Sequence, residues 1–247
     1  MFENRTILVT GASRGIGAEI ASQLVAQGAH VIGTARSGFS APGVTPVVCD
    51  FALPGAARAL ADRIAADHPA CSGLIANAAM MVHTDLTRGA HDDEIALEVM
   101  VNLTAPIQLA TALLPVLSRN GTAQRPAVLN LVTSGLAIAP RAEAATYCAT
   151  KSGLRSFARS LRNQCSDAGL PVHVSETVMT LVATSLSRDL PNRYPPARAA
   201  ADLLTGLRTG QDEIWIQRTR LLRLVHRLSP ALAYRILRGP SVREIAA

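Results

Sequence analysis

Short apolar segments alternate along this chain with longer segments of helical character, and this alternation constrains the fold more than any other feature. Continuous apolar strands that alternate with helices are typical of a parallel sheet covered on both faces. The pattern therefore predicts one α/β domain over residues 1–247, built on a doubly wound seven-stranded parallel sheet. Strands are expected at Thr6–Thr10, His30–Ala35, Pro46–Cys49, Gly73–Ala76, Ala127–Thr133, Val172–Val178 and Glu213–Ile216, and helices near 15–27, 54–67, 92–118, 146–167 and 197–208.

A glycine-rich turn joins the first predicted strand to the first predicted helix. Gly11 allows the tight turn, Gly15 lets backbone approach a pyrophosphate, and Gly17 lets the helix pack close to the sheet. The N–H groups and the dipole at the helix N-terminus favour phosphate. In this strand–turn–helix context, the layout is Rossmann-like and predicts a dinucleotide site that includes Gly11, Ser13, Arg14, Gly15, Ile16 and Gly17.

The end of the second predicted strand indicates which dinucleotide binds. An NAD site places an acidic residue there to bond the ribose hydroxyls, whereas this chain has Ala35 and Arg36, and Arg14 lies in the glycine turn. Guanidinium groups bind phosphate in a bidentate manner, so the pattern favours an NADP(H) site. The alternative is that both arginines are ordinary surface charges. After the third strand, Asp50 either accepts from the adenine amine or acts as a cap, and Phe51 beside it belongs to the same predicted site.

Three polar residues form the candidate catalytic set. Ser134 follows the fifth predicted strand, and Tyr147 and Lys151 lie four residues apart on one face of the next helix. A neighbouring ammonium stabilises a phenolate and lowers the pKa of the tyrosine. Lys151 is the only lysine among 24 lysines and arginines, which favours chemistry over a solvated helix face, because an ammonium can do what a guanidinium cannot.

Asn102 lies inside the helix expected near 92–118, four residues before Pro106. Proline has no N–H, so the main-chain carbonyl of Asn102 loses its helical partner and the helix should kink there. A freed carbonyl near Lys151 would hold a water and relay protons to solvent. The alternative is a polar residue that caps a broken helix.

Together these residues resemble the short-chain dehydrogenase/reductase family over nearly the whole chain, and the segment 175–178 looks like its Dlt-type oxidoreductase branch. The interval of 13 residues from Ser134 to Tyr147 is the family's usual spacing. The resemblance implies that Tyr147 donates a proton, that Lys151 binds the nicotinamide ribose and lowers the pKa of the tyrosine, and that Ser134 polarises the carbonyl. It also implies that Asn102 anchors the relay water.

Two departures from the family pattern concern the cofactor site. The usual Asn-Asn-Ala-Gly after the fourth strand is Ala-Asn-Ala-Ala here, which keeps Asn77 and Ala78. The usual Pro-Gly after the sixth strand is replaced by Met-Thr, although the Val182 backbone and Thr184 remain to hold the nicotinamide carboxamide. The resemblance further places a substrate lid at residues 185–200, where arginines either recognise an anionic substrate or are solvated.

The net charge of +6 lies entirely in the C-terminal tail. Seven of the 24 basic residues and one of the 18 acidic residues occur from Arg218 onward, so residues 1–217 are balanced. Residues 218–247 are expected to form basic amphipathic helices, the second begun by Ser229 and Pro230. Packing on the sheet edge or on a partner subunit is favoured, and docking on an anionic membrane surface is the weaker alternative.

Composition restricts the remaining classes. Hydrophobic residues make up 49% and charged residues 17%, which is typical of a compact protein; no secretory signal and no membrane span are expected. Four cysteines without Cys-x-x-Cys spacing predict buried thiols in a cytoplasmic protein with no metal site. Aromatic residues are only 3%, which argues against nucleic acid.

The sequence therefore predicts a cytoplasmic NADP(H)-dependent oxidoreductase that acts on a small-molecule carbonyl or alcohol substrate as a homodimer or homotetramer. The rival hypothesis is a non-catalytic nucleotide-binding scaffold or redox sensor. Such a protein would dock a partner or a membrane through its tail, and it would have no need of the tyrosine.

Overall fold

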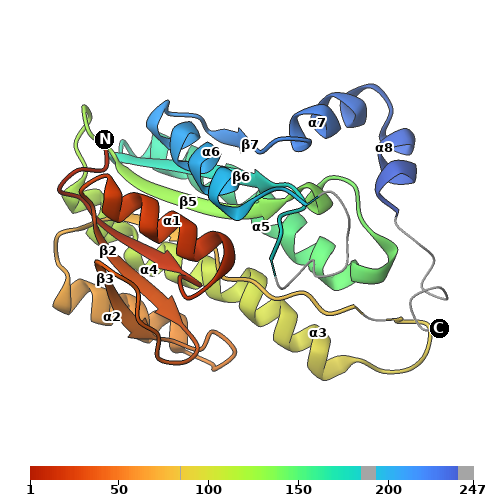
Figure 1. Ribbon diagram of the computed structural model, residues 1–247, viewed down its shortest axis with the longest axis horizontal. Helices are drawn as coiled ribbons and strands as arrows, with labels where there is room; N and C mark the ends of the chain where they lie inside the picture. Colours follow the sequence, from red (N-terminus) through yellow and green to blue (C-terminus); the bar gives the residue numbers. More distant parts are fainter. Residues whose placement is uncertain (84, 185–192, 239–247) are drawn as a thin grey trace.

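The computed structural model describes residues 1–83, 85–184 and 193–238 of the chain (Figure 1). At its centre is a seven-stranded sheet with the strand order β3-β2-β1-β4-β5-β6-β7. Every neighbouring pair of strands is parallel, which confirms the predicted fold class. The strands are β1 (Thr6–Thr10), β2 (His30–Ala35), β3 (Val44–Val48), β4 (Cys71–Ala76), β5 (Ala127–Ser134), β6 (Val172–Met179) and β7 (Glu213–Trp215).

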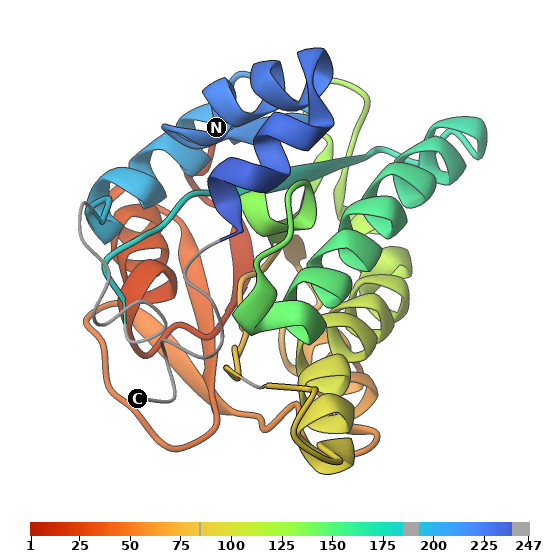
Figure 2. The same cartoon turned by 90° about the vertical axis from the view of Figure 1, so that its right-hand side faces the viewer.

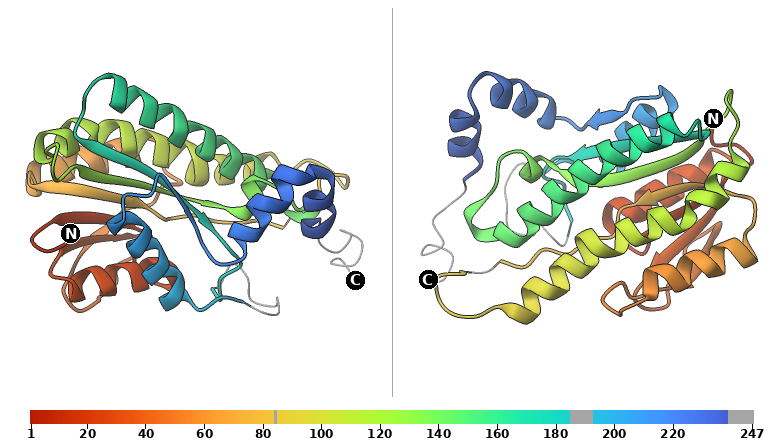
Figure 3. Two further views of the ribbon diagram at one scale, coloured as in Figure 1. Left: turned by 90° about the horizontal axis from the view of Figure 1, so that it is seen from above. Right: turned by 180° about the vertical axis from the view of Figure 1, so that it is seen from behind.

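Helices cover both faces of this sheet (Figures 1 and 3). On one face lie α1 (Gly15–Ala26) and α6 (Pro196–Arg208), and on the other lie α2 (Ala56–Asp67), α4 (Ala105–Asn120) and α5 (Ala145–Asp167). Successive side chains of a strand point to opposite faces, so neighbouring residues of β4 serve different cores. Leu74 packs beneath α2 and α4, whereas Ile75 packs beneath α1 and α6.

Several predicted boundaries shift by one or two residues, and two of the differences from prediction are informative. β3 begins at Val44 rather than at Pro46, so the proline lies inside the strand, paired with Gly33. β3 is an edge strand, and an edge tolerates a residue without an N–H. At the predicted lid, residues 185–192 lie outside the described residues, but Ala199 and Ala200 are fully buried in α6. The C-terminal end of the segment predicted as a lid is therefore part of the packed fold.

The helix predicted near 92–118 is a continuous helical run with an irregular turn in it. It consists of α3 (Asp92–Val99), a π-helical turn (η1, Met100–Thr104) and α4. At the end of η1 the N–H of Ala105 donates to the carbonyl of Met100, five residues back, just before Pro106. The expected irregularity is thus present as a widened turn rather than as an open break.

The run Asp92–Asn120 is also long and apolar enough, at 29 residues, to cross a membrane by length and composition alone. Its leucines at 109, 113 and 117 are fully buried against the sheet. Burial of this kind is typical of a core helix of an α/β fold, and we assign the run to the helical layer that covers this face of the sheet.

Short helices surround the carboxyl ends of the strands. The 3-10 turns η2 (Gly135–Ala137) and η3 (Ala142–Ala144) connect β5 to α5, and α7 (Thr219–Leu228) and α8 (Pro230–Leu237) follow β7. Figure 2 shows α7 and α8, in dark blue, beside the green segment that contains η2 and η3. Ser229 caps α8, its hydroxyl accepting a hydrogen bond from the N–H of Leu232 at 3.3 Å.

Gly17 marks the tightest contact between α1 and the sheet. A Cβ at this position would lie 2.1 Å from the carbonyl oxygen of Gly11 and 2.6 Å from Nδ2 of Asn77. Gly17→Ala is therefore expected to lower the free energy of unfolding by about 1–3 kcal/mol. The matched control is Gly38→Ala, which meets nothing within 4 Å and should change it by less than about 0.5 kcal/mol. Urea unfolding measures both, and equal stabilities would contradict the close packing.

Candidate active site

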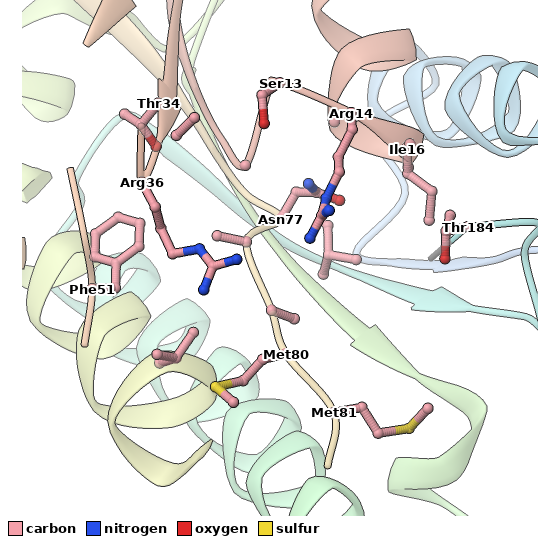
Figure 4. A pocket seen from close by; sticks show the side chains of 18 of the residues that line it. Ser13, Arg14, Ile16, Thr34, Arg36, Phe51, Asn77, Met80, Met81 and Thr184 are labelled. Carbon is pink, nitrogen blue, oxygen red and sulfur yellow. The ribbon is translucent and has the colours of Figure 1, made fainter. Parts of the chain in front are cut away.

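A cavity of about 1020 Å³ opens at the carboxyl edge of the sheet, where β1, β2 and β4 end. The carboxyl ends of parallel strands meet at one edge, so loops far apart in the sequence form its walls together. Figure 4 shows side chains from several of these loops facing the same space. The predicted cofactor residues that line it are Gly11, Ser13, Arg14, Gly15, Ile16, Gly17, Arg36, Asp50, Phe51, Asn77, Ala78, Tyr147, Lys151 and Thr184.

Three predicted site residues lie behind the wall of this cavity rather than in it, namely Ser134, Asn102 and Val182. Val182 is only 4% exposed and belongs to the core beneath α6, and the contact of its backbone with the cofactor stays a prediction. A backbone bridge to Tyr194 holds it there. The next two residues, Ala183 and the predicted Thr184, line the cavity.

The glycine turn is fastened to the end of β4 by one threonine. The hydroxyl of Thr10 accepts the N–H groups of Asn77 and Ala78, both at 3.0 Å, and the Asn77 side-chain amide donates to the Thr10 carbonyl at 3.0 Å. Gly11 and Gly15 have left-handed backbone, with φ of +70° and +59°. Glycine adopts this conformation at little cost, so the turn bends tightly around the start of α1.

The donors on this side of the cavity suit a phosphorylated nucleotide. Arg14, at the N-cap of α1, makes no side-chain cap hydrogen bond to the N–H groups of the first turn. The guanidinium groups of Arg14 and Arg36 extend into the same space beside Asn77 (Figure 4). The hydroxyl of Thr34, a wall residue, is buried without a hydrogen-bond partner in the described structure. Asp50 bonds the N–H of Ala52 at 3.0 Å, as a local cap would.

The candidate catalytic residues come together on the other side of the cavity. Ser134 shares a side-chain hydrogen bond with Tyr147 and accepts the N–H of Leu136 at 3.2 Å. The Lys151 side chain is 2% exposed, and its Nζ donates to the carbonyl of Val132 at 2.9 Å. This Nζ lies 5.7 Å from the centre of the Tyr147 ring. The end of β5 and the first turns of α5 therefore fix all three polar groups.

The pKa values in this cluster differ from the sequence-based expectation. Burial raises the pKa of the Tyr147 hydroxyl to about 12, and the hydrogen bond with Ser134 only opposes that rise. Burial also lowers the pKa of the Lys151 ammonium to about 8, because the charged form loses hydration. The predicted net lowering of the tyrosine pKa by Lys151 is therefore wrong for this arrangement. At neutral pH Tyr147 is a neutral phenol that can donate a proton.

Glu98 is a further group of this cluster that the sequence patterns did not reveal. It is 2% exposed on α3, its carboxylate accepts the N–H of Val82 at 3.2 Å, and burial raises its pKa. Its charge acts on Lys151, whose pKa it raises, and on Tyr147. The sequence feature that could have pointed to Glu98 is its position one helical turn before Asn102, on the same side of the helix.

The side chain of Asn102 makes hydrogen bonds that the sequence did not predict. The fully buried side chain accepts the N–H of Met80 at 2.9 Å and donates to the Met80 carbonyl at 2.7 Å. Asn102 and Glu98 thus hold the segment after β4, whose Met80 and Met81 line the cavity. The relay role of the Asn102 main-chain carbonyl stays a prediction.

Several other wall residues were absent from the predicted site. Some adjoin a predicted residue, as Ala79 and Ala183 do, and others lie one turn apart on the helical run beside the cavity, as Leu97 and Val101 do. Most are apolar, and an apolar residue in a helix carries no signal that separates a cavity wall from a core.

The chain is similar to known proteins over most of its length. The family model for short chain dehydrogenases matches residues 5–194. The protein named uncharacterized oxidoreductase DltE, from Bacillus subtilis (strain 168), is 33% identical over 239 residues, 89% of this chain and 91% of that protein. The solved short chain dehydrogenase from Burkholderia cenocepacia J2315, in complex with NADP, is 25% identical with a TM-score of 0.85, and the match covers 97% of this chain and all of that one.

A second solved structure is a metagenomic short-chain oxidoreductase, also in complex with NADP. It is 26% identical with a TM-score of 0.71, and the match covers 87% of this chain and 98% of that one. These similarities confirm the resemblance that the motifs indicated.

Proposed function

The chain belongs to the short chain dehydrogenase family of oxidoreductases, and from this premise we propose that it is an NADP(H)-dependent enzyme that interconverts a carbonyl and an alcohol. The observation that carries the proposal is that Tyr147 and Lys151 line the cavity that the glycine turn also forms, with Ser134 hydrogen-bonded to Tyr147 from behind the wall. The proposal includes a small-molecule substrate and a homodimer or homotetramer, since the family commonly forms such assemblies.

The residues present fit NADP(H). The N–H groups at the start of α1, which the N-cap side chain does not bond, suit the pyrophosphate, and Arg14 and Arg36 suit the additional phosphate on the adenine ribose. Thr184 faces the turn at Gly15, where it would meet the nicotinamide end. When bound, the nicotinamide supplies or accepts the hydride. The NADP in both solved relatives supports this choice of cofactor.

The chain's own residues move the proton. Tyr147, neutral at pH 7, donates its phenolic proton to a carbonyl oxygen that Ser134 holds beside it. The phenolate that remains is stabilised by the Lys151 ammonium, whose position the Val132 carbonyl fixes. In the reverse direction the phenolate takes the alcohol proton back. Met80, Met81 and Leu97 give the substrate an apolar wall.

Removal of the phenolic hydroxyl tests this chemistry. Tyr147→Phe is expected to lower the rate of NADPH consumption with an active aldehyde or ketone by about 100- to 10,000-fold, because the proton donor is lost. The affinity for NADPH, measured by fluorescence titration, should change little. The matched control is Tyr234→Phe, an exposed tyrosine of α8. Equal rates for wild type and Tyr147→Phe over a broad carbonyl panel would exclude the proposed function.

The two cavity arginines are expected to determine the cofactor. Arg14→Ala and Arg36→Ala should each raise the Kd of NADPH by about tenfold or more and leave the Kd of NADH nearly unchanged, because only NADPH carries the additional phosphate. Arg119→Ala, at the exposed end of α4, is the control. If both cofactors weakened to the same extent, phosphate recognition would have to lie elsewhere.

The buried ammonium sets the alkaline limit of the reduction. Lys151 has a pKa of about 8, so kcat/KM for reduction should fall above about pH 8, where Lys151 loses its charge. The Glu98 charge raises this pKa, so Glu98→Gln should move the fall to lower pH, whereas Glu94→Gln, exposed on the same helix, should not. A pH profile with the same midpoint in all three proteins would contradict the assigned coupling.

A further inference from the structure

Helix α7 is attached to the fold by polar side chains as well as by the packing of Leu222 against Gly135. The Thr219 hydroxyl donates to the carbonyls of Val178 at 3.1 Å and Ile216 at 2.8 Å, and it is 3% exposed. Nε of Arg220 donates to the carbonyl of Trp215 at 2.9 Å, and the guanidinium of Arg223 lies 5.2 Å from the Trp215 ring centre. An amphipathic helix of a globular protein ordinarily packs with its apolar side inward. Here polar side chains make the hydrogen bonds and the ring contact.

Three leucines of α7 face outward, although Leu222 and Val225 are half-buried. Leu221, Leu224 and Leu228 follow one another at helical spacing on one side, and they are 63%, 54% and 77% exposed. On α8, Leu232, Tyr234 and Ile236 are exposed as well. These six residues are half of the twelve large apolar side chains that are exposed in the described part of the chain. An apolar surface of this kind marks a contact with another molecule or with a membrane.

The charge on the same two helices identifies the kind of partner. Residues 218–238 contain six arginines and no acidic residue, whereas residues 1–217 are balanced. No carboxylate in the described part of the chain pairs with Arg218, Arg227 or Arg235. A partner must therefore offer negative charge next to apolar material. A second copy of this chain on the same surface would bring two such basic regions together, and like charges at an interface repel.

We propose that α7 and α8 form a docking surface for an anionic lipid bilayer, with the leucines in the acyl boundary and the arginines at the headgroups. Helices with leucines on one side and arginines on the other lie in membrane interfaces in this way. The surface adjoins the catalytic edge. Leu222 packs against Gly135 in η2, and the Arg238 carbonyl accepts the N–H of Ala142 in η3 at 3.2 Å. Docking would thus place the cavity side of the protein toward the bilayer.

Vesicle flotation of the full chain tests this surface. We expect wild type to float with vesicles of phosphatidylcholine and phosphatidylglycerol, to float much less with phosphatidylcholine alone, and to be released as salt is added. The variant Leu221→Ser/Leu224→Ser/Leu228→Ser should lose at least about tenfold in vesicle binding. The matched control is Leu53→Ser/Leu86→Ser, which changes leucines that are 61% and 43% exposed elsewhere, and it should bind as wild type does.

Circular dichroism, melting and NADPH titration of each variant serve as controls for its fold and its cavity. Vesicle binding is measured without turnover, so the test does not depend on the proposed reaction. Absence of flotation with phosphatidylglycerol vesicles, equal flotation with both lipids, or unchanged binding of the triple variant would overturn the proposal. A dimer in solution that the triple variant converts to a monomer, without flotation of either, would assign the surface to a second copy of the chain instead.

Discussion

The arrangement of the whole site depends on the hydrogen bonds that Thr10 makes at the end of β1. Its hydroxyl accepts two N–H groups from the end of β4, and its carbonyl accepts the Asn77 side-chain amide. The same amide and the Gly11 carbonyl leave no room for a side chain at Gly17. The central strands, the glycine turn and the first helix are therefore held together by direct contacts at the end of the cavity where we propose that the phosphates bind. Donors held in place in this way would lower the cost of ordering on binding.

The opposite end of the cavity is governed by burial of charge. A buried ammonium is costly, and here the Val132 carbonyl and the charge of Glu98 compensate Lys151 only in part, so its pKa falls to about 8. The Tyr147 hydroxyl is kept protonated by the same desolvation. In the proposed mechanism this protonated state lets Tyr147 donate a proton, and the Lys151 ammonium would then stabilise the phenolate that donation creates.

The fold class and most of the cavity could be predicted from the sequence, because strand alternation, the glycine turn and the Tyr147–Lys151 spacing are local patterns that few unrelated folds combine. Other features needed the packing. In the sequence, Glu98 cannot be distinguished from a solvated carboxylate of a helix, because its burial depends on packing. Thr34 likewise has the pattern of an ordinary strand residue, although it lines the cavity in the structure. The net pKa of Tyr147 was mispredicted because spacing conveys proximity to Lys151 but not desolvation. The periodicity of the tail likewise indicated an amphipathic helix. It did not indicate which side of that helix would contact the fold, where Arg223 lies over the Trp215 ring.

One cavity is proposed to combine a nucleotide site with a proton donor for carbonyl reduction. The most direct measurement uses NADPH deuterated at the transferring carbon of the nicotinamide, incubated with the purified protein and an active ketone. Mass spectrometry of the product then locates the label. We predict deuterium on the carbinol carbon in wild type. Binding of the labelled NADPH with no deuterium in any alcohol product, across aldehydes and ketones of different size, would contradict this mechanism.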